Sequence, residues 1–364
     1  MSEARHNWTK KEILEIYNAP LMELLYNAAT VHRKYHDPNT VQVSTLLSIK
    51  TGGCPEDCGY CPQAARYHTD IEGNDLMTVS HVKAQALRAK ASGSSRVCMG
   101  AAWRNVKDGP EFDQVLEMVR TINKLDMEVC CTLGMLTENQ AQRLAEAGLY
   151  AYNHNLDTSE DYYKDVISTR AFEDRLETID NVRKSNVTVC SGGIIGMGEK
   201  VEDRAGMLVA LSTLDPQPES VPINALVAVE GTPMEDMEPI PIWDMVRMVA
   251  TTRIVMPKTQ VRLSAGRTEM TREGQAMCFF AGANSIFAGD KLLTTPNPDV
   301  NEDMEMFRLL GLNPQKPFVK ASQPDTVEAS ESKYGSLGEK PKWTRPGHII
   351  ERNEAAKVRT KLPD

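Results

Sequence analysis

The chain of 364 residues has no stretch of about 18 consecutive apolar residues, so the sequence predicts no membrane span. Its first residues, MSEARHNWTKKEILEIY, lack the apolar segment of a secretory signal, which favours a cytoplasmic, reducing setting. A basic excess is also missing, because 41 Lys and Arg oppose 50 Asp and Glu, for a net charge of −9. This balance argues against a nucleic-acid partner, which would need a basic face.

Cysteine is sparse as well, with eight in the chain, but three of them cluster in TGGCPEDCGYCP as Cys54, Cys58 and Cys61. In a reducing compartment, clustered cysteines are more often metal ligands or catalytic groups than disulfides. A [4Fe–4S] cluster held only by protein uses four cysteines. Three on one short loop therefore leave one iron open, and a small molecule can chelate that iron and receive an electron.

A structural zinc site is the main alternative for this loop. Such sites are closed by four nitrogen or sulfur ligands, usually from two C-x2–4-C pairs or from additional paired histidines. The next histidine, His68, lies seven residues after Cys61, and no second C-x2-C pair occurs. The spacing therefore favours an iron–sulfur cluster over zinc.

Strand-like runs alternate with amphipathic stretches along the chain. Apolar residues recur at helical spacing in these stretches, as in Val115, Met118, Val119 and Ile122. Eight strand–helix units predict an α/β fold, a parallel (β/α)8 TIM-type barrel, with an open doubly wound sheet as the rival. The expected strands are 46–50, 96–101, 128–133, 151–156, 187–192, 221–227, 260–265 and 284–288.

The barrel is predicted to occupy residues 41–324. Residues 1–40 would form an N-terminal helical extension, with helices at 10–19 and 21–33 that cap the bottom of the barrel. Residues 325–364 are polar and nearly aperiodic, which predicts a flexible C-terminal tail. The cysteine loop follows the first strand, so we expect it at the barrel mouth, where functional loops of such barrels lie.

Three further cysteines fall on separate expected strands: Cys98, Cys130 and Cys190. Arg262 lies within another expected strand that is otherwise apolar. Side chains that point into a barrel stack in layers, so these residues can meet around a second metal cluster. Each residue also has an ordinary alternative. A lone buried cysteine packs as a small hydrophobe, and a buried arginine commonly forms an ion pair.

The segment YNHNLD places Asn153, Asn155 and Asp157 on one face by strand alternation and turns His154 the other way. We interpret His154 as a satisfied histidine in the layer between strand and helices. Asn and Asp are also typical of turns at strand ends. The glycine-rich run at 192–199 permits close approach of backbone to a ligand, although such a run is weak evidence by itself.

The cysteine loop resembles the signature of the radical S-adenosylmethionine (SAM) enzymes, and longer segments resemble the biotin synthase family over roughly residues 10–320. The resemblance implies that Cys54, Cys58 and Cys61 hold a [4Fe–4S] cluster whose open iron binds SAM. It also implies a [2Fe–2S] cluster deep in the barrel, held by Cys98, Cys130, Cys190 and Arg262. The matching segments are TGGCPEDCGYCPQAARY, RVCMGAAWR, CTLGMLT, YNHNLDTS, VCSGGIIGMGE, ESVPINALV, VRLSAGR and GANSIFAGDKLLTTPNP.

The pair Cys130 and Cys131 makes the third-strand ligand ambiguous. Alignment of the following Thr-Leu-Gly with the family pattern puts the ligand at Cys130, and strand alternation prevents both side chains from facing inward. Cys278 falls on an expected helix and matches no ligand, so we interpret it as packing.

The resemblance also implies contacts to SAM and to the substrate, dethiobiotin. An asparagine amide can complement both the N–H groups and the carbonyl of a cyclic urea. Asn153 and Asn224 match residues near that urea, and Thr294 and Thr295 match the region that holds the substrate carboxylate. The residues implied near SAM are Tyr60, Asn155, Asp157, Gly192, Ile194 and Gly196.

The implied activity is SAM cleavage, hydrogen abstraction from dethiobiotin, and sulfur insertion from the second cluster to give biotin. The implied partners are a flavodoxin- or ferredoxin-type electron donor, cluster-assembly proteins and a second copy in a homodimer. A lipoyl synthase would need an extra N-terminal cysteine motif, and no cysteine precedes Cys54. Radical mutases or maturases would not need the second ligand set, and an iron–sulfur carrier or scaffold would rarely need a barrel.

Overall fold

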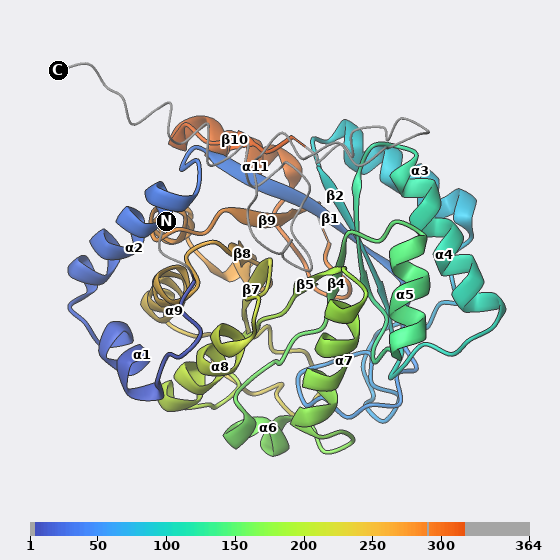
Figure 1. The fold of residues 1–364 in the computed structure, drawn as a ribbon, viewed down its shortest axis with the longest axis horizontal. Coiled ribbons are helices and arrows are strands. Elements are labelled where there is room, and N and C mark those ends of the chain that lie inside the picture. Colours follow the sequence, from blue (N-terminus) through green and yellow to red (C-terminus); the bar gives the residue numbers. More distant parts are fainter. Residues whose placement is uncertain (1–3, 290, 317–364) are drawn as a thin grey trace, which may run out of the picture.

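Eight strand positions close into a parallel barrel in the computed structural model, which describes residues 4–289 and 291–316 (Figure 1). Neighbouring strands are parallel throughout, and the last strand, β9, pairs with β1 to close the ring. Closure confirms the TIM-type barrel over the open sheet. The strands are β1 (Thr40–Lys50), β2 (Arg96–Ala101), β3 (Glu128–Thr132), β4 (Ala151–Asn153), β5 (Thr188–Cys190), β6 (Gly193–Ile195), β7 (Ser220–Ala225), β8 (Gln260–Leu263) and β9 (Ser285–Ala288), and a short β10 (Asn313–Pro314) pairs with the start of β1.

The first, fourth and fifth strands differ most from the sequence-based expectation, and β4 ends at Asn153 instead of residue 156. β1 begins at Thr40 instead of Leu46, because the polar Gln42 and Ser44 belong to the strand and are fully buried. The fifth position is divided into β5 and β6 around Gly192. A Cβ at Gly192 would lie 2.0 Å from the carbonyl oxygen of Pro222 on β7, so only glycine permits this approach.

Helices surround the barrel and begin at recognisable caps. Thr9 and Thr137 each form a capping box, with Glu12 and Gln140 respectively. No helix in the described residues is long and apolar enough to cross a membrane. The helices are α1 (Lys10–Tyr17), α2 (Leu21–Tyr35), α3 (Val79–Ala91), α4 (Pro110–Asn123), α5 (Glu138–Glu146), α6 (Glu160–Val166), α7 (Phe172–Lys184), α8 (Val201–Thr213), α9 (Ile242–Val255), α10 (Arg272–Phe280) and α11 (Val300–Leu310).

The two N-terminal helices pack against α8 and α9 in the outer layer (Figure 1). Arg247 on α9 donates to the backbone carbonyls of Tyr17 and Ala19, at 2.7 and 2.8 Å, and so fixes the turn between α1 and α2. That these helices cap the bottom of the barrel stays a prediction. The predicted tail, 325–364, lies outside the described residues.

The apolar core fills the space between the barrel and its helices. Phe112 on α4 is fully buried there, and the guanidinium carbon of Arg143 lies 4.8 Å from its ring centre. We expect Phe112→Ala to lower the free energy of unfolding by about 3–5 kcal/mol, because it leaves a cavity. Urea unfolding measures this, with Phe280→Ala as the control. Phe280 is 49% exposed, so an equal loss at both positions would contradict the assigned core.

Candidate active site

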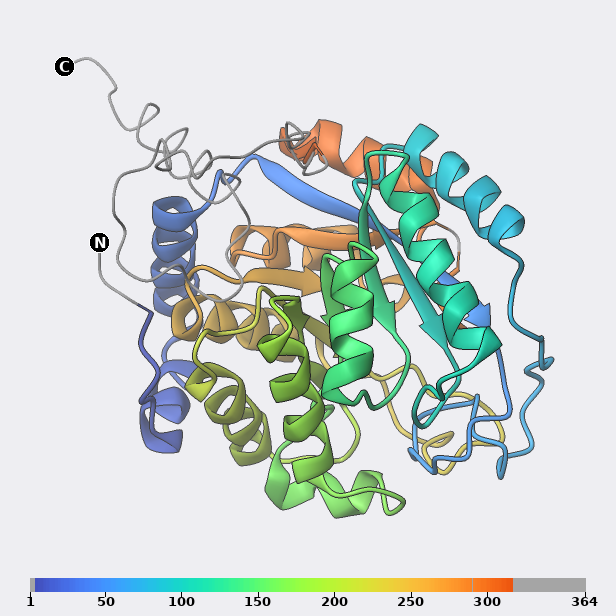
Figure 2. The same cartoon turned by 45° about the vertical axis from the view of Figure 1, so that its right-hand side comes forward.

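The cysteine loop follows β1 and lies at one end of the barrel, beside the connection from β7 to α9 (Figure 2). It closes on itself, because Cys54 N donates to Gln63 O at 3.0 Å and Ala65 N donates to Cys54 O at 2.7 Å. The end of α6 anchors it, because Gly59 N donates to the carbonyl oxygen of Val166 at 2.9 Å. The strand end and two backbone clamps therefore hold the three cysteines in place.

Asp57 is the second anchor of this loop. Its carboxylate accepts from the backbone N–H groups of Ser168 and Thr169 at 2.9 and 3.1 Å, and from both hydroxyls. Burial alone would raise the pKa of Asp57, but these hydrogen bonds outweigh it and lower the pKa to about 2. The carboxylate therefore stays charged and bound at neutral pH.

The three thiols suit a cationic cluster better than a single metal ion. Burial raises the pKa of Cys58 to about 11, and burial together with the nearby Cys58 raises that of Cys61 to about 12. Such thiols become thiolates when a positively charged group binds them. Among the described residues, no three His, Cys, Asp or Glu side chains converge on one metal ion. In a cluster each thiolate binds a different iron, so its ligands need no common point.

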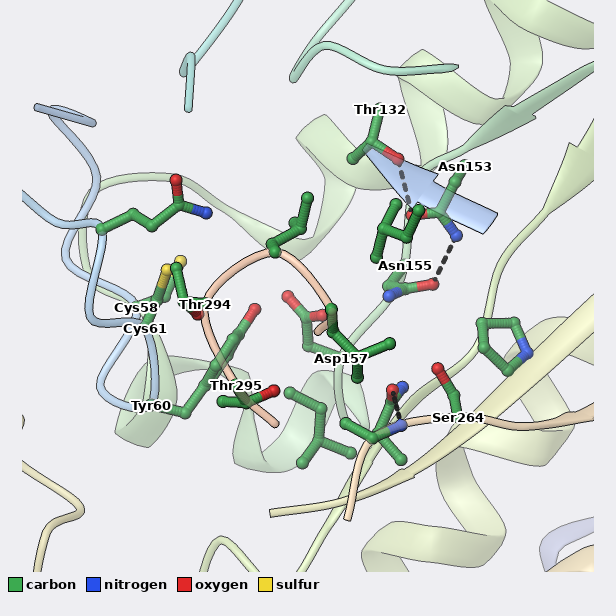
Figure 3. Close-up of a pocket in the computed structure, with 18 of the residues that line it drawn as sticks. Cys58, Tyr60, Cys61, Thr132, Asn153, Asn155, Asp157, Ser264, Thr294 and Thr295 are labelled. Atoms are coloured by element: carbon green, nitrogen blue, oxygen red, sulfur yellow. Dashed lines mark hydrogen bonds between the residues drawn. The ribbon is translucent and has the colours of Figure 1, made fainter. Parts of the chain in front are cut away.

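A cavity of about 320 Å³ opens beside this loop and extends into the barrel (Figure 3). Residues from all eight strand positions or the loops after them line it. All three loop cysteines line the cavity, and so do Cys98, Cys130 and Arg262 from the barrel interior. The structure therefore brings the loop cysteines and three of the four predicted interior ligands to one cavity, while Cys190 contacts the lining residues Asn153 and Arg262 from behind the wall.

Cys98 and Cys130 are direct neighbours in the register of β2 and β3. The Cys130 thiol donates to Cys98, and this bond with the charges of Arg262 and Arg96 lowers the pKa of Cys98 to about 7 despite its burial. Cys190 on β5 receives a hydrogen bond from Asn153 Nδ2 at 3.3 Å. Buried sulfurs from three strands thus face one another across the interior.

Arg262 completes this group from β8. Its Nη1 lies 3.9 Å from Cys190 Sγ, and its carbon Cζ lies 4.6 Å from the ring centre of Phe287. No ion pair joins Arg262 to a carboxylate within residues 4–289 and 291–316. The ion-pair interpretation of Arg262 is therefore wrong, and its guanidinium faces the cysteine sulfurs.

The other two cysteines pack in the apolar layer. Cys131 is fully buried among the residues between strands and helices, whereas Cys130 belongs to the cluster that includes Cys98 and Phe287. Cys278 on α10 is also fully buried in the apolar layer. Strand alternation thus points Cys130 inward and Cys131 outward.

Asp157 and Asn155 line the cavity next to Tyr60 (Figure 3). Asp157 is buried, has a φ of 68°, and pairs with Arg175 of α7. Asn155 Oδ1 accepts from Gly192 N at 3.2 Å. Burial and the charge of Asp157 raise the pKa of Tyr60 far above its ordinary value, so its hydroxyl stays neutral.

The glycine-rich segment contributes one of its three predicted residues to the cavity wall. Ile194 lines the cavity, whereas Gly192 and Gly196 do not. Gly196 N donates to the Glu199 carboxylate at 3.0 Å, and its φ of 98° favours glycine. These two glycines shape the turn that presents Ile194.

All four residues predicted to contact substrate line the cavity. Asn153 accepts from the Thr132 hydroxyl at 3.2 Å and donates to Asn155 Oδ1 at 3.0 Å (Figure 3). The Asn224 amide bridges backbone groups, donating to Gly193 O at 2.9 Å and accepting from Ala265 N at 3.1 Å. Thr294 and Thr295 lie on the loop after β9.

His154 lies on the side that strand alternation predicted. It is 3% exposed, and its ring stacks on that of Tyr152 in the apolar layer, with ring centres 6.4 Å apart. It also borders the cavity, and its Nε2 has no hydrogen-bond partner among the described residues, so the histidine is not satisfied as predicted. Burial and the charges of Arg175 and Arg170 lower its pKa well below the ordinary value.

Two arginines that line the cavity were not predicted from the sequence. Arg170 and Arg175 both line the cavity, and the side chain of Arg170 is 6% exposed. Arg170 Nε lies 3.4 Å from Glu56 Oε1, but its Nε and Nη1 have no hydrogen-bond partner within the described chain. Their place at the start of a helix that follows a barrel strand is the signal that points to such residues.

We expect Asp57→Ala to loosen the cysteine loop, because it removes the hydrogen bonds from Ser168 and Thr169. Loss of such a supporting group typically weakens metal binding by about 10- to 100-fold. Iron retained per chain after anaerobic incubation with a chelator measures this. Asp161→Ala is the control, since its side chain is 75% exposed; equal iron loss in both variants would contradict the anchoring role.

Comparisons with known proteins agree with this geometry. Residues 48–211 match the radical SAM superfamily, and residues 222–313 match the biotin and thiamin synthesis associated domain. The biotin synthase of Flavobacterium psychrophilum is 85% identical over 353 residues, covering 97% of this chain and 98% of that protein. The biotin synthase of Cytophaga hutchinsonii is 63% identical over 324 residues, covering 89% and 96%.

Two solved structures share the fold at low sequence identity. A methylornithine synthase aligns with a TM-score of 0.70 at 18% identity, covering 85% of this chain and 94% of its own. HydG, a maturase of the [FeFe]-hydrogenase, aligns with a TM-score of 0.72 at 17% identity, covering 85% and 72%. These likenesses establish the fold alone, whereas the sequence relatives establish the family. The chain belongs to the biotin synthase family of radical SAM enzymes.

Proposed function

We propose that this protein converts dethiobiotin to biotin, with a [4Fe–4S] cluster that cleaves SAM and a [2Fe–2S] cluster that donates sulfur. The observation that carries the proposal is the shared cavity. The three loop cysteines line it beside the loop, and Cys98, Cys130 and Arg262 line it inside the barrel, with Cys190 in contact with Arg262. A radical generated at the first set would meet substrate and a sulfur source within one enclosed space.

The loop cysteines, Cys54, Cys58 and Cys61, would hold the [4Fe–4S] cluster. Cluster and SAM together supply a carbon radical, a chemistry that no acid or base side chain provides. The barrel wall would exclude water from this reaction. Asp57 and the backbone clamps keep the loop fixed, so the three sulfurs retain their places through turnover.

The interior residues Cys98, Cys130, Cys190 and Arg262 would hold the [2Fe–2S] cluster. The charges of two guanidinium groups favour thiolate at Cys98. Arg262 lacks a carboxylate partner in the described residues, which leaves its Nη1 available to the cluster. Cys131 and Cys278 are excluded from this role because both lie in the apolar layer.

SAM would lie between the loop and the ends of β4 to β6. Tyr60 and Ile194 offer apolar surface to its adenine, while Asn155 and Asp157 offer polar groups to its ribose. Gly192 and Gly196 shape the turn that carries Ile194. A neutral Tyr60 suits this place, because a phenolate would repel the Asp157 carboxylate.

Dethiobiotin would lie deeper, between SAM and the second cluster. Asn153 contacts both Asn155 and Cys190, so it connects the proposed SAM site with the proposed sulfur source. Thr294 and Thr295 would donate to the substrate carboxylate. Both the N–H group and the oxygen of the Asn224 amide form hydrogen bonds with backbone groups. This supports a role for Asn224 in shaping the cavity wall near the urea.

The proposal includes partners and a setting. A flavodoxin- or ferredoxin-type protein would reduce the first cluster, and assembly proteins would rebuild the second after it gives up sulfur. We further propose a cytoplasmic homodimer.

Genetic complementation tests this proposal. The gene should restore growth without biotin to a bacterium that lacks its own biotin synthase and is supplied with dethiobiotin. The Cys54→Ala variant should fail, and Cys278→Ala, which alters a cysteine outside the cavity, should succeed. A gene that instead rescues a lipoate auxotroph would send the assignment to another sulfur-inserting enzyme.

A further inference from the structure

A buried charge network lies directly beneath the interior cysteines. Arg96 on β2 is fully buried, and its Nε donates to Glu128 Oε2 at 2.8 Å. Its Nη2 donates to Glu219 Oε1 at 3.2 Å. Arg96 and Glu128 each stand two residues before an interior cysteine on the same strand, so they form the layer below the sulfurs.

Gln42 on β1 connects this network with Arg262. Its Oε1 accepts from Arg262 Nη2 at 2.9 Å, and its Nε2 donates to Glu128 Oε2 at 3.4 Å. The Ser285 hydroxyl accepts from Arg262 Nε at 2.9 Å and donates to Gln42 Oε1 at 3.1 Å. Arg262, Ser285 and Gln42 thus form a closed ring of hydrogen bonds.

The charges of the network explain why a glutamine stands at this position. Arg96 pairs with both Glu128 and Glu219, whereas Arg262 pairs with no carboxylate among the described residues. A direct carboxylate partner would pull the Arg262 guanidinium down and away from the sulfurs. An amide accepts from Arg262 and donates to Glu128, so it joins the two charged groups without adding charge.

We propose that Gln42 is a positioning residue that holds the Arg262 guanidinium toward the Cys190 sulfur and thereby retains the second cluster. The inference rests on the proposed function, in which Arg262 contacts that cluster. Gln42 is 0% exposed and acts only through Arg262, so it touches neither substrate nor SAM. Its three side-chain hydrogen bonds, to Arg262, Ser285 and Glu128, set the side from which Nη1 approaches the sulfurs.

The test is Gln42→Met, which keeps the length of the side chain and removes all three of its hydrogen bonds. After anaerobic reconstitution, Mössbauer spectroscopy and visible absorption follow the two clusters separately during incubation with a chelator. We expect the [2Fe–2S] signal to decay about tenfold faster or more than in the wild type, with an altered spectrum. The [4Fe–4S] signal should be unchanged and reports that the barrel is folded.

Val43→Ala is the matched control. Val43 is the next residue on β1, is equally buried and faces the apolar layer, so its variant is weakened in packing but keeps the Arg262 ring. The Val43→Ala variant should lose its [2Fe–2S] signal no faster than the wild type does. Equal loss in Val43→Ala and Gln42→Met would overturn the positioning role, because it would reflect general destabilisation.

Gln42→Asn provides a second test in case the methionine variant does not fold. It keeps an amide in the polar interior but withdraws it by one methylene from Arg262, so the same faster decay is expected. If either variant folds and retains the second cluster as the wild type does, the inference is wrong. A wild-type protein that assembles no [2Fe–2S] cluster would instead overturn the proposed function.

Discussion

Cys58→Ala is expected to abolish SAM cleavage, with no 5′-deoxyadenosine detectable above background. Cys58 is buried beside Cys61, and a cluster that already relies on three thiolates has no spare protein ligand. The reconstituted variant should lack the [4Fe–4S] Mössbauer signal. Mass spectrometry of an anaerobic reaction with SAM and a reductant measures the product.

The barrel itself should survive this change. Cys98 and Cys130 belong to a separate buried cluster and Cys190 lies on β5, so the proposed [2Fe–2S] cluster should still assemble in Cys58→Ala. Retention of both 5′-deoxyadenosine formation and the [4Fe–4S] signal would show that the cluster uses other ligands. Loss of both clusters together with the fold would show that Cys58 is structural.

Cys130→Ala is expected to remove the second cluster and to abolish biotin formation. The Cys130 sulfur contacts Cys98 inside the barrel, and its loss leaves two cysteines for a cluster that uses three with Arg262. The first cluster and SAM cleavage should persist, since the loop cysteines are untouched. Visible absorption, Mössbauer spectroscopy and product analysis on one preparation separate these effects.

Cys131→Ala is the matched control, one residue along the same strand. Its side chain faces the apolar layer, so we expect a loss of about 1 kcal/mol in the free energy of unfolding and an intact second cluster. The reverse outcome, in which Cys131→Ala loses the cluster and Cys130→Ala keeps it, would mean that the assigned register of β3 is wrong.

Much of this architecture could be predicted because barrel strands and their following helices have regular patterns. β2 was expected at 96–101 and lies there, and the periodic Val115, Met118, Val119 and Ile122 are all buried on α4. Alternation predicted that only one of Cys130 and Cys131 faces inward, and the resemblance of the following Thr-Leu-Gly to the family pattern selected Cys130. Sequence periodicity therefore predicts the bounds and the buried face of an element wherever the element follows a regular pattern.

Residues whose place depends on distant partners could not be predicted. From the sequence alone, the polar Gln42 and Ser44 are typical of a loop before β1. They are buried in the strand because both side chains accept hydrogen bonds from Arg262, which is distant in sequence. His154 keeps a buried Nε2 without a hydrogen-bond partner among the described residues, which no local pattern indicates. Arg170 lies on a loop, and sequence periodicity does not predict the path of a loop toward the cavity.

The most direct test of the account is an anaerobic reaction of the reconstituted protein with SAM, a reductant and dethiobiotin. Mass spectrometry should detect biotin together with 5′-deoxyadenosine, and the [2Fe–2S] signal should fall as biotin appears. Formation of 5′-deoxyadenosine without biotin, in a protein that carries both clusters, would contradict the central claim that dethiobiotin is the substrate.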